Sequence, residues 1–213
     1  MKTAILAGAT GLIGSQVLDL LIKDKSYQSV IAITRKALTI SNPKLQNLVF
    51  DFDRMSDFSD LLKGDDVYCC LGTTIKQAGT KEAFRKVDFS YPVDLANITQ
   101  QQGARQFLLV TALGANKSSS IFYNQVKGEV EEAISSIGFI TLHIFQPSML
   151  IGPRTDARSG ETAGQGVMKF LDFMIPKKYK AIESGKVAKA MINFALQNDT
   201  GKFTHQSGEL QSF

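Results

Sequence analysis

The chain has 213 residues, of which 44% are hydrophobic, and its formal net charge at pH 7 is +4. This length suits one domain with a substantial buried core and is short for two ordinary domains with a linker. Lys and Arg are spread along the chain without a long run of like charges, so we expect no nucleic-acid partner.

The amino-terminal residues predict neither export nor membrane insertion. Their short apolar stretch is broken by Gly8, Gly11 and Gly14, which does not suit a signal peptide or a membrane span. We therefore expect a cytoplasmic protein without a membrane partner. Cys69 and Cys70 are adjacent, so a disulfide between them would be strained, and we expect reduced thiols in the core.

Short apolar runs alternate with helix-like stretches up to about Pro153, which is typical of a parallel sheet covered on both faces. The sequence thus predicts an α/β fold, a doubly wound parallel sheet in one domain over 1–213, with 153–213 as a small, largely helical extension on the substrate side. The predicted strands are 3–7, 30–34, 48–52, 66–71, 106–111, 139–145 and a short strand at 202–206. The predicted helices are 12–23, 57–62, 80–101, 122–136, 167–174 and 185–197, with a polar loop at 154–166.

Three glycines lie where the first predicted strand leads into the first predicted helix. The segment reads Gly8-Ala9-Thr10-Gly11-Leu12-Ile13-Gly14, and its first two glycines are one residue further apart than in the common G-x-G-x-x-G motif. Glycines here allow a tight turn, let a diphosphate approach backbone N–H groups and the positive helix end, and let helix and strand pack closely. A tight turn without a ligand is the alternative, but the position favours a dinucleotide site.

The residues after the second predicted strand indicate which dinucleotide to expect. NAD-binding proteins usually carry Asp or Glu about twenty residues after the glycine motif, whereas this chain has Arg35 and Lys36. The Arg35 guanidinium could pair with the 2′-phosphate of NADP, with Lys36 in support. We therefore predict NADP(H) as cofactor; the alternative is that both residues are solvated charges at a strand end.

Tyr123 is the only tyrosine that is followed four residues later by a lysine, Lys127. This spacing places both side chains on one face of a helix. Beside a nicotinamide, the lysine ammonium favours the phenolate form of tyrosine, which suits proton transfer at neutral pH, and the lysine could also hold the cofactor ribose. A chance match is the alternative, but the pair opens a helix near the carboxyl ends of the central strands, where ligands bind.

Together these motifs resemble the atypical short-chain dehydrogenase/reductases. In particular they resemble the NAD(P)-binding oxidoreductase-like proteins that include the animal Tat-interacting protein and bacterial proteins labelled as nucleoside-sugar epimerases. That family has a Rossmann-type sheet and generally uses NADP(H). The resemblance covers residues 1 to about 160 and rests also on CCLGTT at 69–74, VTALGA at 110–115, YNQVKGEVE at 123–131 and QPS at 146–148.

The resemblance implies a role for individual residues. A diphosphate would be held by Gly8, Thr10, Gly11, Leu12, Ile13 and Gly14. The 2′-phosphate would meet Arg35, and the adenine would meet Asp51 and Phe52. The ribose side would be lined by Leu71, Gly72 and Thr73, and the nicotinamide end would contact Pro147 and Ser148. The catalytic pair would be Tyr123 and Lys127.

One departure from the family pattern concerns the serine at the end of strand five, which hydrogen-bonds the substrate carbonyl. This chain has Thr111-Ala112-Leu113 there. Thr111 could supply the catalytic hydroxyl from a position that is a residue early, and the serines at 118–120 are weaker candidates. Catalysis is therefore less firmly predicted than cofactor binding.

The leading hypothesis is an NADP(H)-dependent oxidoreductase that moves a hydride between nicotinamide and the carbonyl or alcohol carbon of an unidentified small-molecule substrate. A first alternative, motivated by the missing serine, is an NADP(H)-binding regulator that senses redox state without turnover. A second is a nucleotide-sugar epimerase, although few residues follow Gly152 for the large substrate lobe of such enzymes.

No metal site is expected, because no Cys, His or carboxylate cluster has metal-ligand spacing. His143 is interpreted as a buried, hydrogen-bonded strand residue. Relatives often dimerise through the helices that correspond to 80–101 and 122–136, so a homodimer is one assembly that the sequence allows.

Overall fold

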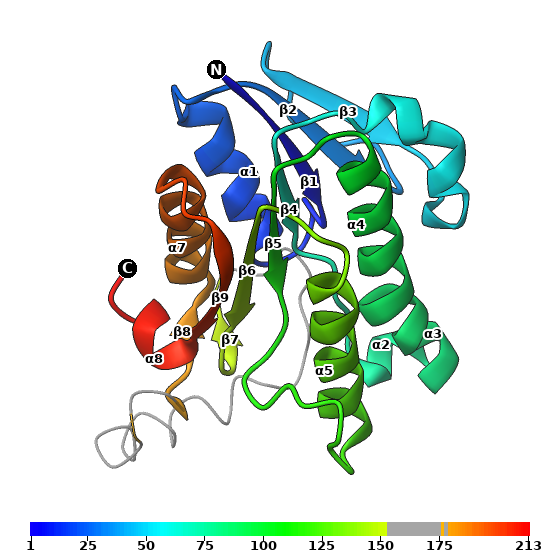
Figure 1. The fold of residues 1–213 in the computed structure, drawn as a ribbon, viewed down its shortest axis with the longest axis vertical. Coiled ribbons are helices and arrows are strands. Elements are labelled where there is room, and N and C mark those ends of the chain that lie inside the picture. Colours follow the sequence, from blue (N-terminus) through cyan, green and yellow to red (C-terminus); the bar gives the residue numbers. More distant parts are fainter. Residues whose placement is uncertain (153–175, 177–178) are drawn as a thin grey trace.

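A sheet of seven parallel strands runs through the molecule in the order β3-β2-β1-β4-β5-β6-β9 (Figure 1). The computed structural model describes residues 1–152, 176 and 179–213. The strands are β1 (Lys2–Ala7), β2 (Tyr27–Thr34), β3 (Leu45–Val49), β4 (Asp66–Cys69), β5 (Gln106–Val110), β6 (Thr141–Gln146) and β9 (Gly201–Gln206). A separate pair consists of β7 (Leu150–Ile151) and β8 (Ile182–Glu183).

Helices cover both faces of the sheet, as the alternation of apolar runs predicts. One face carries α1 (Gly14–Lys23), α7 (Ser184–Leu196) and the short α8 (Ser207–Leu210), and α4 (Tyr91–Gln101) and α5 (Phe122–Ser135) lie on the other (Figure 1). The remaining helical segments are the 3-10 helix η1 (Phe52–Leu61), α2 (Ile75–Ala78), α3 (Lys81–Arg85) and the π-helical turn η2 (Lys86–Ser90), which leads directly into α4.

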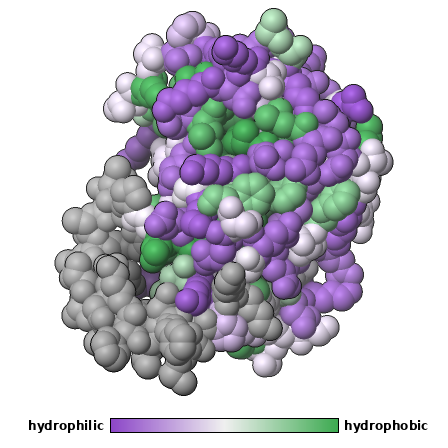
Figure 2. All heavy atoms as spheres, turned by 90° about the vertical axis from the view of Figure 1, so that its left-hand side faces the viewer, coloured by the Kyte–Doolittle hydropathy of each residue, from purple (hydrophilic) through white to green (hydrophobic). Residues whose placement is uncertain are grey.

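The core has two layers, one on each side of the sheet, because successive strand residues point to opposite faces. On β1, Ala4 and Leu6 join the cluster under α1 and α7, whereas Ile5 and Ala7 join the cluster under α4 and α5. The outer side of the α1 and α7 layer carries mostly hydrophilic side chains with apolar patches between them (Figure 2). Helices that bury one apolar stripe against a sheet expose such a surface.

The predicted fold class is confirmed, and several element boundaries need correction. The third strand was predicted at 48–52 but is β3 at 45–49, because Phe50 and Phe52 leave the sheet and pack into the core as η1 begins. The helix predicted at 57–62 is η1, and the long helix predicted at 80–101 contains the π turn. The loop at 154–166 and the helix at 167–174 lie outside the described residues.

The carboxyl-terminal residues complete the sheet. Helix α7 and strand β9 match the predictions at 185–197 and 202–206 to within a residue at each end. The pairing of β7 with β8 was not predicted. No helix in the described part of the chain is long and apolar enough to cross a membrane.

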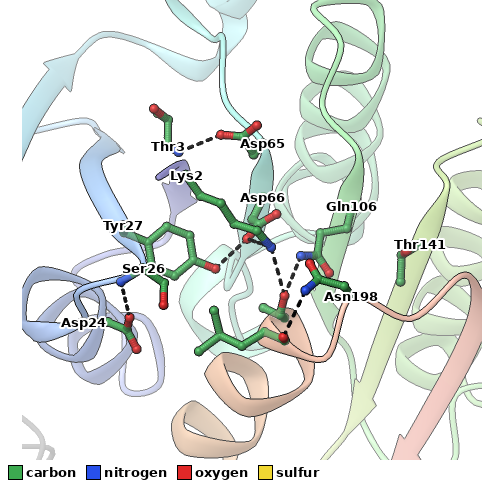
Figure 3. A network of polar contacts seen from close by, with 12 residues as sticks. Lys2, Thr3, Asp24, Ser26, Tyr27, Asp65, Asp66, Gln106, Thr141 and Asn198 are labelled. Atoms are coloured by element: carbon green, nitrogen blue, oxygen red, sulfur yellow. Dashed lines mark hydrogen bonds and ion pairs between the residues drawn. The ribbon is translucent and has the colours of Figure 1, made fainter.

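A polar network ties the amino ends of the central strands to α7 (Figure 3). The buried Asp66 carboxylate accepts a hydrogen bond from the Tyr27 phenol at 2.5 Å and lies 3.1 Å from the Lys2 ammonium. The Tyr27 and Tyr68 oxygens are 2.8 Å apart. Lys2 and Gln106 both donate to the carbonyl oxygen of Ala195 in α7. The network therefore satisfies buried polar groups at the end of the sheet opposite the glycine turn.

Tyr27 should make stability sensitive to alkaline pH. Burial, together with Tyr68 and Asp66, raises the pKa of Tyr27 far above its ordinary value of 10.0. Above about pH 10 the unfolded chain releases this proton while the folded chain retains it, so stability that is complete at lower pH falls as pH rises. We expect Tyr27→Phe to cost about 1–2 kcal/mol at neutral pH and to lose less stability than wild type between about pH 9.5 and 11. Urea unfolding measures both; parallel losses in the two proteins would contradict this assignment.

Candidate functional site

A pocket of about 570 Å³ opens at the carboxyl ends of β1, β2 and β4. Strand β1 has β2 on one side and β4 on the other, so chain order reverses at this point of the sheet. Ligands of open α/β sheets bind at such a reversal, and the volume lies in the usual range for small-molecule sites.

The glycine turn at the pocket brings three pieces of backbone into direct contact. Gly8 has a positive φ of 88°, and a Cβ on Gly8 would lie 2.5 Å from the carbonyl oxygen of Cys70. A Cβ on Gly14 would collide with the carbonyl oxygen of Gly8. The turn is closed by a hydrogen bond of 2.9 Å from the Gly11 N–H to the same oxygen. Only glycine therefore fits at positions 8 and 14.

Helix α1 starts at this turn with its positive end toward the pocket. Its N-cap residue, Ile13, makes no side-chain capping bond, and its first turn carries no acidic residue. The Ser15 and Gln16 N–H groups of the first turn donate to the carbonyl oxygens of Gly11 and Ile13. An anion such as a diphosphate would therefore meet the helix dipole and the N–H groups that precede Ser15. Thr10 and Gly11 are exposed and line the pocket.

The far end of the pocket combines a cation with aromatic rings. Arg35 follows β2, is exposed and lines the pocket. The rings of Phe52 and Tyr91 lie 5.3 Å apart in the pocket wall. Asp53 accepts hydrogen bonds from the Lys86 ammonium at 2.6 Å and from the Tyr91 phenol at 2.8 Å, and these bonds lower its pKa. This arrangement suits an aromatic base with a nearby phosphate.

The opposite end of the pocket reaches a buried ion pair. The side chain of Lys127, in α5, has only 5% of its surface exposed, and its ammonium lies 2.7 Å from the carboxylate of the fully buried Asp88. Burial opposes the charge on Lys127, but Asp88 and Tyr123 together raise its pKa above the ordinary value. A Cβ on Gly72, which lines the pocket, would lie 3.7 Å from the ammonium nitrogen.

Tyr123 lies one helical turn from Lys127 and is half-buried. Its ring packs against Phe84 at 5.6 Å, and the Lys127 ammonium is 6.0 Å from the ring centre. The predicted pair is thus adjacent in space, just beyond the end of the pocket at Gly72.

Thr111 has a partner of its own. Its buried hydroxyl donates to the Glu131 carboxylate at 2.5 Å, and the Gln146 amide donates to the same carboxylate at 3.0 Å. Burial raises the pKa of Glu131. Glu131 lies two turns along α5 from Tyr123, so the Thr111 hydroxyl is engaged away from the phenol. Among the serines at 118–120, Ser118 and Ser120 are exposed, and the Ser119 hydroxyl accepts a hydrogen bond from the Ile121 N–H.

The residues predicted for the nicotinamide end, Pro147 and Ser148, are hydrogen-bonded to neighbouring segments. The Ser148 hydroxyl donates to the carbonyl oxygen of Lys180 and accepts from the Ser207 hydroxyl at 2.8 Å. The Pro147 carbonyl oxygen accepts from the Leu113 N–H at 2.9 Å. These bonds connect the segment after β6 with the loop after β5 and with the carboxyl-terminal residues.

About half of the predicted cofactor residues line the pocket: Gly8, Thr10, Gly11, Arg35, Phe52, Leu71, Gly72 and Thr73. The others do not, namely Leu12, Ile13, Gly14, Lys36, Asp51, Lys127, Pro147 and Ser148; Ile13 is buried, and Asp51 caps η1 through the Asp53 N–H. Their proposed roles remain predictions. Lining residues that were not predicted are Ala9, Ile33, Thr34, Cys70, Gln77, Ala78, Ala83, Val87 and Tyr91.

Two of the missed residues carried a signal in the sequence. Tyr91 follows Ala83 and Val87 at intervals of four along one helical run, which marks a single face. Asp88 follows the buried Phe84 by four residues, so it is a carboxylate on a buried helix face, where charged groups are rare unless paired.

His143 is buried and hydrogen-bonded, as predicted. Its Nδ1 lies 3.0 Å from Nε2 of His205, and burial lowers its pKa to about 4. Among the described residues, no group of three His, Cys, Asp or Glu side chains could hold a metal ion.

Solved structures with the same fold include one in complex with NAD⁺ and one with UDP-glucose. WbmH of Bordetella bronchiseptica in complex with NAD⁺ matches with a TM-score of 0.74 at 14% identity, covering 97% of this chain and 76% of that one. The UDP-glucose 4-epimerase of Thermotoga maritima, solved with UDP-glucose, matches with a TM-score of 0.71 at 14% identity, covering 97% and 77%. At these identities the likeness concerns the fold.

Sequence comparison identifies the family. A family model described as NAD(P)H-binding matches residues 8–137, which is more than half of the chain. Protein HTATIP2 of Rattus norvegicus is 32% identical over 94% of this chain and 84% of its own length. The mitochondrial protein FMP52 of Candida albicans is 30% identical over 95% and 91%. The chain therefore belongs to the NAD(P)H-binding family of atypical short-chain dehydrogenase/reductases that includes these proteins.

Proposed function

We propose that this protein is an NADP(H)-dependent oxidoreductase that acts on a carbonyl or alcohol carbon of a small molecule. The observation that carries the proposal is the arrangement of two cationic groups about one pocket. Arg35 lies at the end beside Phe52 and Tyr91, and Lys127 lies behind Gly72 at the other, with the glycine turn between them. Such a pocket suits a dinucleotide with an extra phosphate on its adenosine half.

The backbone and the charges about the pocket support cofactor binding. The amino end of α1 would receive the diphosphate, because the helix dipole is positive there and the first turn carries no side-chain cap and no acidic residue. Arg35 would pair with the 2′-phosphate, with Lys36 nearby on the same exposed segment. The Phe52 and Tyr91 rings would contact the adenine, and Lys127 the nicotinamide ribose.

The chemistry assigned to the chain is proton transfer. A bound NADPH would supply the hydride for carbonyl reduction. Tyr123 would donate its phenolic proton to the substrate oxygen, and Lys127, whose ammonium lies 6.0 Å from the centre of the Tyr123 ring, would stabilise the resulting phenolate. The substrate would occupy the space beside Tyr123, outside the pocket itself.

A regulator that binds NADP(H) without turnover is a second candidate function. It is favoured by one observation, the engagement of the Thr111 hydroxyl by Glu131, which leaves the expected hydroxyl partner of the tyrosine occupied elsewhere. Nucleotide-sugar epimerisation ranks third and is untested. A cytoplasmic location and a homodimer also stay predictions, and the FMP52 relatives are named as mitochondrial proteins.

Arg35→Ala should separate the two forms of the cofactor. Loss of a charged contact to the 2′-phosphate should weaken NADPH binding roughly tenfold or more, while NADH affinity changes less than about twofold. Isothermal calorimetry with both nucleotides measures this, with Arg54→Ala as control, because Arg54 pairs with Asp57 on the surface. Tighter binding of NADH than of NADPH by the wild type would contradict the NADP(H) assignment.

Tyr123→Phe should separate the enzyme from the regulator. The variant keeps the ring that packs against Phe84 but lacks the proton, so NADPH-dependent reduction should slow by roughly a hundredfold or more with NADPH affinity nearly unchanged. Oxidation of NADPH with a panel of aldehydes and ketones measures the rate. Tight NADPH binding without turnover of any panel member by the wild type would favour the regulator instead.

A further inference from the structure

A buried carboxylate, Asp88, lies behind the predicted catalytic pair. It has 1% of its surface exposed, and its two oxygens contact different segments. One lies 2.7 Å from the Lys127 ammonium, and the other accepts a hydrogen bond of 2.9 Å from the backbone N–H of Thr73. Asp88 therefore connects α5 to the turn after β4, where that turn lines the pocket.

The backbone around Asp88 is also unusual. Asp88 is the central residue of the π-helical turn η2, which interrupts the helical run between α3 and α4. π turns occur mostly as single insertions in α-helices and frequently at functional sites. The neighbours Val87 and Phe89 are only half-buried, so Asp88 is the one buried residue of this turn.

The pair constrains the position of the Lys127 side chain. A long lysine side chain has many rotamers, and ordering it has an entropic cost. With both partners buried, the ion pair is attractive and poorly screened, so the ammonium is held at one place before any ligand binds. That place is beside Gly72, where a Cβ would lie 3.5 Å from the Asp88 carboxylate and 3.7 Å from the ammonium.

We propose that Asp88 is a positioning residue that acts through Lys127: it holds the ammonium against the Gly72–Thr73 turn, ready for the nicotinamide ribose of the cofactor. This inference rests on the proposed function, because it assumes that a dinucleotide occupies the pocket. The Asp88 side chain itself contacts no substrate atom in this proposal. Its effect is limited to the half of the cofactor that Lys127 can reach.

Two probes of different length test this selectivity. NADPH would span the whole pocket in this proposal, whereas adenosine 2′,5′-bisphosphate has the adenosine and its 2′-phosphate but no nicotinamide ribose. Asp88→Asn preserves the shape of the side chain and an acceptor for the Thr73 N–H but removes the charge. We expect this variant to bind NADPH roughly tenfold more weakly and the bisphosphate within about twofold of wild type. Asp94→Asn, an exposed carboxylate on α4, serves as matched control and should match wild type with both probes.

A double-mutant cycle tests whether Asp88 acts through Lys127. If it does, Asp88→Asn should weaken NADPH binding in the wild type but not further in a Lys127→Met background.

The cycle also addresses folding. Each single variant leaves one buried charge unpaired, so its melting temperature should fall by roughly 10 °C, and Lys127→Met with Asp88→Asn should recover much of this loss. If Asp88→Asn alone fails to fold, the NADPH affinities of the double variant and of Lys127→Met can still be compared. Equal affinities would support the inference, and a weaker affinity in the double variant would overturn it.

The outcomes separate this inference from the proposed function. Failure of the wild type to bind either probe would overturn the proposed function and this inference with it. If the wild type binds both probes and Asp88→Asn loses affinity for both equally, Asp88 is a merely structural residue. That result would overturn only the inference. Unchanged NADPH affinity in Asp88→Asn, or a further loss in the Lys127→Met background, would also overturn it.

Discussion

The structure depends on a steric constraint at the glycine turn, where the backbones after β1, at the end of β4 and at the start of α1 touch directly. A methyl group on Gly8 would meet the Cys70 carbonyl oxygen, and one on Gly14 would meet that of Gly8. This close approach places the positive end of α1 and the carboxyl ends of two strands at one pocket. The pocket is therefore a consequence of how β1, β4 and α1 pack, and the chain belongs to a family that is described as NAD(P)H-binding.

Charge is distributed about this pocket in two different ways. Arg35 is exposed at one end, where water screens its charge until a ligand arrives. Lys127 at the other end is enclosed and already neutralised by Asp88. An exposed guanidinium suits recognition of a phosphate. An enclosed, oriented ammonium suits a contact at a fixed position, such as the one proposed with the nicotinamide ribose. The two ends thus suit the two tasks that the proposed function assigns to them.

The sequence allowed the fold and the glycine turn that lines the pocket to be predicted, because both depend on local patterns. The strand-helix alternation, the glycine spacing and the interval between Tyr123 and Lys127 each follow from backbone periodicity. Contacts between distant segments were harder to predict. The edge strand β3 lacks a continuous apolar run. Its predicted position was therefore three residues too late, toward Phe50 and Phe52. Two of these contacts are the ion pair of Asp88 with Lys127 and the hydrogen bond of Thr111 with Glu131. Both form only when the helices pack against the sheet.

A crystal structure of the protein with NADP⁺ is the measurement that tests the central claim most directly. We expect the diphosphate at the first turn of α1, the 2′-phosphate at the Arg35 guanidinium and the nicotinamide ribose within hydrogen-bond distance of Lys127. Density for the dinucleotide at any other place, or crystals grown with saturating NADP⁺ whose pocket stays empty, would contradict the account.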